Sequence, residues 1–100
     1  MAENEMKAVG AFHGAHAAAA RPGHVAINWT TPTPRCNRIS VRRHTCECVP
    51  EVFELCQAGG LRFIRRTVRE AGAVVVHESD WAVSAVAGRL WELLLGGHAR

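Results

Sequence analysis

The fold is decided by the stretch from Val52 to Glu78, VFELCQAGGLRFIRRTVREAGAVVVHE. It contains three short runs of alternating or β-branched residues, and glycine-containing turns separate them. Three strands joined by two turns are expected, at residues 52–57, 58–60, 61–69, 70–72 and 73–78. Glycine at the end of a three-residue loop supplies the left-handed backbone conformation of a bulged hairpin turn. The stretch therefore predicts an antiparallel meander.

The flanking residues add one strand and one helix. Upstream, residues 38–47 alternate weakly and Pro50 ends the run, which predicts a further strand. Downstream, Ser79 or Asp80 can cap a helix that continues from Trp81 to about residue 95 and stops at two glycines. The expected fold class is α+β, with a three- to four-stranded antiparallel meander followed by one C-terminal helix on one sheet face (β-β-β-β-α).

The length of the first turn sets the register of the sheet. A three-residue turn at 58–60 places Leu55 opposite Phe63, whereas a two-residue turn places Glu54 opposite Arg65 as an ion pair. A slip of one residue moves every side chain to the other face. The three-residue turn is expected, because it gathers one apolar layer from Ile39, Val41, Phe53, Leu55, Leu61, Phe63 and Val75.

The domain organisation follows from a change of composition near Arg35. Residues 1–35 are rich in Ala, Gly, His and Pro, and the alternating Thr-Pro stretch favours extended chain. Residues 1–35 are therefore expected to be a disordered or weakly ordered tail, of which Trp29 alone is expected to be buried. Residues 36–100 form the small α+β domain.

Targeting signals are weak in this sequence. The N-terminus makes a poor signal peptide, because glycine and histidine interrupt its apolar run. No stretch approaches the ~18 apolar residues of a membrane span. We therefore expect a cytoplasmic protein with reduced thiols and no contact with a membrane.

Self-association is the main functional expectation. About 65 residues supply only a modest core, and the predicted helix is apolar over more than half of its circumference. One helix covers one sheet face, which leaves the other open. The sequence therefore predicts a small non-enzymatic interaction or regulatory module, a homodimer or the partner of another protein, that uses the helix or a sheet face. That face comprises Arg42, Arg62, Ile64, Arg66, Val68, Val74 and Val76.

Nucleic-acid binding is an alternative. The net charge is +3, and eleven of the twelve basic residues are arginine, which contacts phosphate well. Sheet platforms for single strands, however, stack bases on exposed aromatic side chains. This chain has no Tyr, and its Phe residues are expected in the core. The composition therefore favours a protein partner over a nucleic acid.

A small zinc-binding domain is the second alternative. Its candidate ligands are His44, Cys46 and Cys48, but alternate residues of a strand lie roughly 6.5–7 Å apart. They converge only if the strand bends after Cys48, and the usual Cys-x-x-Cys turn is missing. Histidines 13, 16 and 24 have no acidic or cysteine neighbours in the tail. No metal or other cofactor is expected.

Enzymatic activity is not expected. The sequence contains no Gly-x-Ser-x-Gly, P-loop or Gly-x-Gly-x-x-Gly motif. The Ser79-Asp80 pair is explained as a helix cap rather than as part of a catalytic set. About 65 foldable residues also leave little chain for a substrate cleft beside the core.

Overall fold

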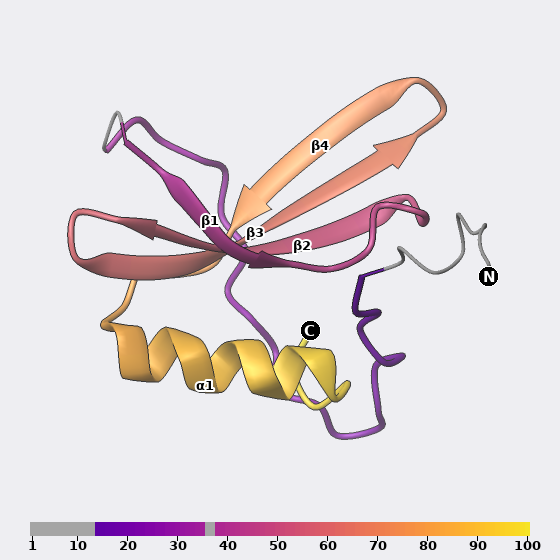
Figure 1. The fold of residues 1–100 in the computed structure, drawn as a ribbon. Helices are drawn as coiled ribbons and strands as arrows, with labels where there is room; N and C mark the ends of the chain where they lie inside the picture. The colour runs from indigo at the N-terminus through magenta and orange to yellow at the C-terminus, as the bar shows by residue number, and fades with distance from the viewer. Residues whose placement is uncertain (1–13, 36–37) are drawn as a thin grey trace, which may run out of the picture.

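The computed structural model describes residues 14–35 and 38–100. Within them, four antiparallel strands in the order β1-β2-β3-β4 precede one helix that packs on the sheet (Figure 1). The predicted α+β fold is confirmed. The elements are β1 Ser40–His44, β2 Glu51–Ala58, β3 Leu61–Glu70, β4 Ala73–Glu78 and α1 Ser84–Leu95.

The turn between β2 and β3 has two residues rather than three. Gly59 and Gly60 both have positive φ, 56° and 81°, as the tightest hairpin turn requires at both central positions. Leu55 therefore lies opposite Ile64, and Glu54 lies opposite Arg65. The expected three-residue register is wrong by one position, because a Gly-Gly pair allows the shorter turn.

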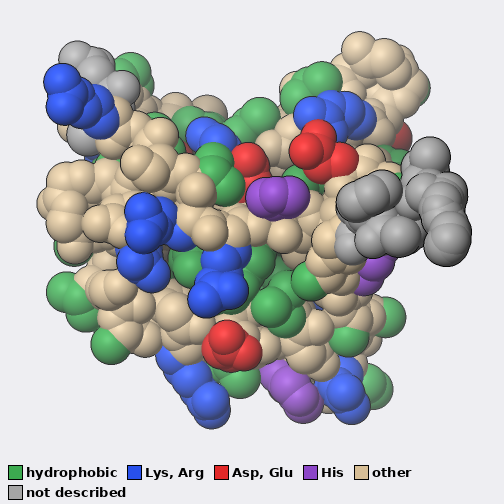
Figure 2. Space-filling model, in the orientation of Figure 1, with side chains coloured by type: hydrophobic (Ala, Val, Ile, Leu, Met, Phe, Trp, Pro, Cys, Tyr) green, Lys and Arg blue, Asp and Glu red, His purple; other side chains and the backbone are tan. Residues whose placement is uncertain are grey.

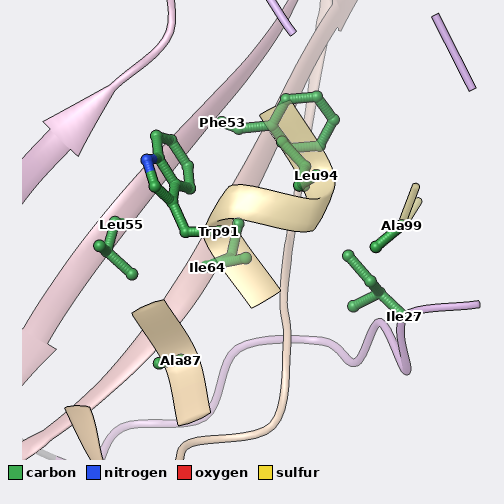
Figure 3. Packing of buried hydrophobic residues seen from close by; sticks show 8 residues of the cluster. All are labelled: Ile27, Phe53, Leu55, Ile64, Ala87, Trp91, Leu94 and Ala99. Atoms are coloured by element: carbon green, nitrogen blue, oxygen red, sulfur yellow. The ribbon is translucent and has the colours of Figure 1, made fainter. Parts of the chain in front are cut away.

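The helix packs on β2 and β3 through one face. Ala87, Trp91 and Leu94 are its buried residues, at the spacing of a single helical stripe. Figure 3 shows the packing around this stripe. Each large apolar side chain buried there contributes about 1.5–3 kcal/mol. The buried cluster consists of Ile27, Phe53, Leu55, Ile64, Ala87, Trp91, Leu94 and Ala99.

The shifted register exchanges two residues that flank each other on β3. Ile64, rather than Phe63, faces the helix and is 0% exposed. Phe63 belongs to a second cluster with Cys56 and Ala58 on the opposite face. Trp81 covers this cluster, with its ring stacked on Phe63 at a centroid distance of 4.5 Å. This part of the second sheet face is therefore closed by the chain itself.

The outer strands contribute little to the core. Ile39, Val41 and Val75, which were expected in the apolar layer, are all exposed. The reason is geometric, because α1 contacts β2 and β3 but neither β1 nor β4. The predicted layer is therefore correct only for Phe53 and Leu55 of β2, because Leu61 and Phe63 of β3 lie on the opposite face.

The start of the helix also differs from the prediction. Ser79 follows β4 and is buried, and its hydroxyl accepts a hydrogen bond of 2.8 Å from the backbone N–H of Ile64 on β3. The helix begins at Ser84, and its N-cap, Val83, makes no side-chain capping bond. Ser79 thus bonds to β3 just after the end of β4 and does not cap the helix.

Residues 14–35 run along the domain (Figure 1) and are hydrogen-bonded to it at several places. The N–H of Ala18 donates to the carbonyl of Leu95, Val25 bridges to Ala99, and Thr30 exchanges two bonds of 2.9 Å with Glu78. The described part of the expected tail is thus seated on the domain. Two physical causes are the unpaired carbonyl groups at the end of α1 and the apolar side chain of Ile27, which joins the core.

Trp29 is half-buried rather than buried, and its indole N–H donates to the carbonyl oxygen of Arg100 over 2.7 Å.

Among the described residues, no helix is long and apolar enough to cross a membrane.

Candidate functional site

The predicted interaction face is divided by the observed register. Ile64 is buried beneath α1, so it cannot belong to an open surface. Strand alternation puts Arg62, Arg66 and Val68 on the same side of the sheet as Ile64. Val74 and Val76 lie on the opposite side, and Arg42 lies at a bulge on β1. The seven residues therefore do not form one surface. The turn between β3 and β4 has two residues, Ala71 and Gly72, rather than the three expected at 70–72, and this places Val74 and Val76 on the other side.

Three arginines of β3 have partners inside the chain. Arg65 pairs with Glu54 at 2.8 Å, and Arg66 pairs with Glu51 at 2.6 Å. Arg62 donates to the side-chain oxygen of Gln57 over 3.2 Å. The side-chain oxygens of Glu54, Glu51 and Gln57 accept from guanidinium N–H groups that could otherwise contact phosphates. The nucleic-acid alternative consequently gains no support from this strand.

The outer edge of β4 is the most exposed apolar feature of the sheet. Val74 is 59% exposed and Val75 is 48% exposed. Both lie on the β3–β4 hairpin, which stands out at the upper right of Figures 1 and 2. A solvent-facing strand of valines is a surface on which another strand can pair.

The backbone of this edge is only partly paired. Glu78 bonds Thr30 through both its N–H and its carbonyl, on the side of β4 away from β3. Outward-pointing residues alternate along an antiparallel strand, so Val76 and Val74 present their backbone groups on that same side. No described residue bonds those groups. Two N–H and two carbonyl groups are thereby left for a further strand.

The opposite edge, β1, has a different chemistry. All five of its residues are exposed, and its register with β2 shifts between Val41 and Arg43. A bulge and charged side chains both discourage a further strand from pairing. β1 is therefore a protected edge.

A thiol–imidazole cluster lies near the turn that follows β1. The side-chain ligand atoms of His16, Cys46 and Cys48 all lie within 4.8 Å of one another. The strand ends at His44 and a turn begins at Glu47, so the two cysteines converge as a bend allows. The third sequence candidate, His44, is not part of the cluster, and its Nδ1 lies 3.0 Å from the carbonyl oxygen of Thr45.

The protonation of the thiols follows their surroundings. Hydrogen bonding with the Cys46 thiol, followed by burial, raises the pKa of Cys48. Burial raises the pKa of Cys56, on β2, to about 11. Cys46, Cys48 and Cys56 are all free thiols. The sequence points to the two clustered cysteines and, separately, to His16, but it does not bring them together, because residues 1–35 are expected to be a disordered or weakly ordered tail.

Comparisons with protein-family models, with curated proteins and with solved structures find no match for this chain. Its function is therefore argued from its own geometry.

Proposed function

We propose that this chain is a small protein-interaction module that self-associates by pairing the β4 strands of two copies. The observation that supports it is the β4 edge, where Val74 and Val76 direct backbone groups outward that no described residue bonds, beside the exposed side chains of Val74 and Val75. Buried sheet edges satisfy such groups by pairing, and an exposed flat edge invites a second strand.

A second copy is favoured as the occupant because the free edge is self-complementary. Thr30 closes the edge at Glu78, and the turn at Gly72 ends it on the other side. An antiparallel pair that uses both outward residues joins Val74 of one copy to Val76 of the other, and the reverse. The two-fold axis then passes between the two copies of Val75. Such an isologous contact uses the same edge of both copies, so assembly stops at the dimer.

Other apolar surfaces offer weaker support for self-association. In the helix predicted from the sequence, Trp81, Leu93 and Leu95 make the apolar face wider than one sheet face needs. In the structure Trp81 stacks on Phe63, and both leucines are half-buried against the core cluster. These three side chains are therefore largely covered by the chain itself, whereas Val83 and Val86 are exposed but offer no strand edge for pairing.

The dimer is expected to be weak and dependent on concentration. The pairing adds about four backbone hydrogen bonds, each with a net contribution of about 0.5–1.5 kcal/mol. Association also has an entropic cost of several kcal/mol, and one strand pair is at the small end of interface sizes. Valine burial supplies the remaining stabilisation.

Sedimentation equilibrium of the reduced full chain tests the proposal. The variants are Val74→Lys and the matched control Val41→Lys, which places the same charge on an exposed valine of the other edge strand. The wild type and Val41→Lys should show the same concentration-dependent rise toward the dimer mass. Val74→Lys should remain at the monomer mass with an unchanged circular dichroism spectrum.

Two results would overturn the proposal. One is a wild-type chain that stays monomeric over the whole concentration range, which would leave β4 for another protein or for none. The other is a Val74→Lys variant that dimerises as strongly as the wild type, which would move the interface elsewhere.

A further inference from the structure

The His16, Cys46 and Cys48 cluster combines three ligands of two types, imidazole and thiol, in positions that suit a thiophilic cation. Thiolate and imidazole are the side chains that bind Zn²⁺ in tetrahedral sites. At Zn–S and Zn–N distances of ~2.3 and ~2.0 Å, a sulfur and a nitrogen on one tetrahedral centre lie about 3.5 Å apart. The Sγ of Cys48 and the Nε2 of His16 are 3.6 Å apart.

Both halves of the cluster are held by hydrogen bonds to the fold. The backbone N–H of Cys46 donates to the carbonyl of Ala15 over 2.8 Å, which brings the segment before His16 against the turn. Thr45, immediately before Cys46, is buried, and its hydroxyl accepts a 2.9 Å bond from the N–H of Phe53. The cysteine turn is thereby fixed to β2.

The segment that carries His16 is anchored on its other side as well. Ala18 donates its N–H to the end of α1, and its carbonyl accepts from the guanidinium of Arg100. His16 is therefore positioned by the end of α1 and by Arg100 as well as by the cysteine turn. A cation would join two parts of the chain that are already adjacent, so little ordering would be needed on binding.

The cluster is also accessible from solvent. Cys48 and His16 are exposed, whereas Cys46 is buried. His16 lines a groove of about 690 Å³ that includes Ala17–Ala20 and the ends of β2 and β3. A cation can reach the exposed Cys48 and His16 from solvent, and a water molecule can take the fourth position of a site with three protein ligands.

From these observations we infer that His16, Cys46 and Cys48 form a binding site for one thiophilic divalent cation of the Zn²⁺ class. The site links the N-terminal segment to the turn between β1 and β2. It differs from the sequence candidate in its histidine, which comes from the N-terminal segment rather than from the strand. Its location is separate from the β4 edge, so each can be tested without the other.

Equilibrium binding of Zn²⁺ to the reduced full chain, in competition with a chromophoric chelator, tests the inference. The wild type should bind one Zn²⁺ per chain. Cys48→Ser and His16→Gln should each weaken binding at least about tenfold, because removal of a ligand costs no less than removal of a group that supports one. Cys56→Ala and His24→Gln are matched controls and should bind as the wild type does.

Co²⁺ gives a second readout that does not depend on affinity alone. The wild type and both controls should show thiolate-to-cobalt charge-transfer absorption and the intense visible bands of a tetrahedral ion. Cys48→Ser should lose part of the charge-transfer intensity. A wild-type chain without stoichiometric binding, or variants that bind Zn²⁺ as tightly as the controls, would overturn the inference.

Discussion

The two outer strands of this sheet differ in the features that decide whether a further strand can pair with them. β1 carries Arg42 and Arg43 around a bulge, and each of its five residues is exposed. β4 contains three consecutive valines, without a bulge in its pairing with β3, and its first charged residue is Glu78 at the far end. Charges and bulges are the ordinary means by which an edge strand avoids pairing. Only one edge of this protein has them.

The contrast teaches where an interaction surface lies in a protein with few other landmarks. Neither strand is covered by α1, so neither is needed for the apolar core. The composition of each strand is therefore free to serve another purpose. The arginines and the bulge of β1 protect that edge from pairing, while Val74 and Val75 of β4 are exposed and have no packing role among the described residues. Pairing of β4 with a second copy would give them one.

The largest expected effect is a loss of stability on substitution in a central strand, compared with substitution in an edge strand. Ile64→Ala should lower the free energy of unfolding by about 2–5 kcal/mol, because it removes a buried side chain beneath the helix. Val75→Ala should change the stability of the monomer by no more than about 0.5 kcal/mol. Urea denaturation at low protein concentration measures both. Similar losses for the two variants would mean that β4 belongs to the core.

The second prediction concerns the dependence of stability on pH. Burial raises the pKa of Cys56 from 9.0 to about 11, so the folded protein keeps this thiol protonated after the unfolded chain has lost its proton. The stabilisation is complete below pH 9 and is lost as the pH rises toward 11. The difference amounts to up to about 3 kcal/mol.

Cys56→Ala is the control for this pH effect, since the other thiols remain. Its unfolding free energy should fall less steeply between pH 9 and 11 than that of the wild type. Equal slopes would show that Cys56 titrates normally and that the cover supplied by Trp81 is open to water.

The third prediction uses proline to distinguish the outward face of β4 from its inward face. The N–H of Val74 points away from β3, so Val74→Pro leaves the ladder intact and removes a donor that the dimer needs. Dimer affinity should fall at least about tenfold, since the two-fold pair loses two hydrogen bonds that contribute about 1 kcal/mol each, and the ring obstructs the partner strand. Analytical ultracentrifugation measures the affinity.

Val75→Pro is the matched control, because the N–H of Val75 points toward Val68 within the sheet. This variant should unfold at a lower temperature, whereas Val74→Pro should keep the wild-type melting temperature of the monomer. Equal destabilisation by both prolines would contradict the assigned direction of the backbone groups.

The smallest predicted effect concerns the ion pair that accompanies the two-residue turn. Arg65 and Glu54 are partly exposed, so solvent screens their attraction. A double-mutant cycle with Arg65→Met and Glu54→Gln should give a coupling energy of about 0.5–1 kcal/mol. A coupling of zero would indicate that the pair does not help to hold the register.

The sequence predicted the order of the elements well, because period-two alternation, glycine turns and one apolar helical stripe are local signals. It failed where a choice depended on packing. The Gly59-Gly60 pair was compatible with two turn lengths, and the shorter one exchanged Phe63 for Ile64 in the main core. The sequence also could not show that Ile27 would complete that core.

The candidate sites could be predicted only in part from the sequence, for the same reason. Cys46 and Cys48 were recognised from their spacing, but His16 lies thirty residues upstream of Cys46, and only the fold brings it close. The seven residues of the predicted face depended on the register and were divided when it shifted. The outward direction of the backbone at Val74 and Val76 emerges only once Thr30 is seen to pair with Glu78.

Disulfide trapping at the two-fold axis tests the central claim most directly. Opposite residues at a non-hydrogen-bonded position of an antiparallel pair have Cα atoms about 4.5 Å apart, within the range of a disulfide. Val75→Cys should therefore form a covalent dimer under mild oxidation, well above the wild-type background. Val74→Cys, exposed on the same strand but opposite Val76 of the partner, should not. Equal cross-linking of both variants, or of neither, would contradict the proposed pairing.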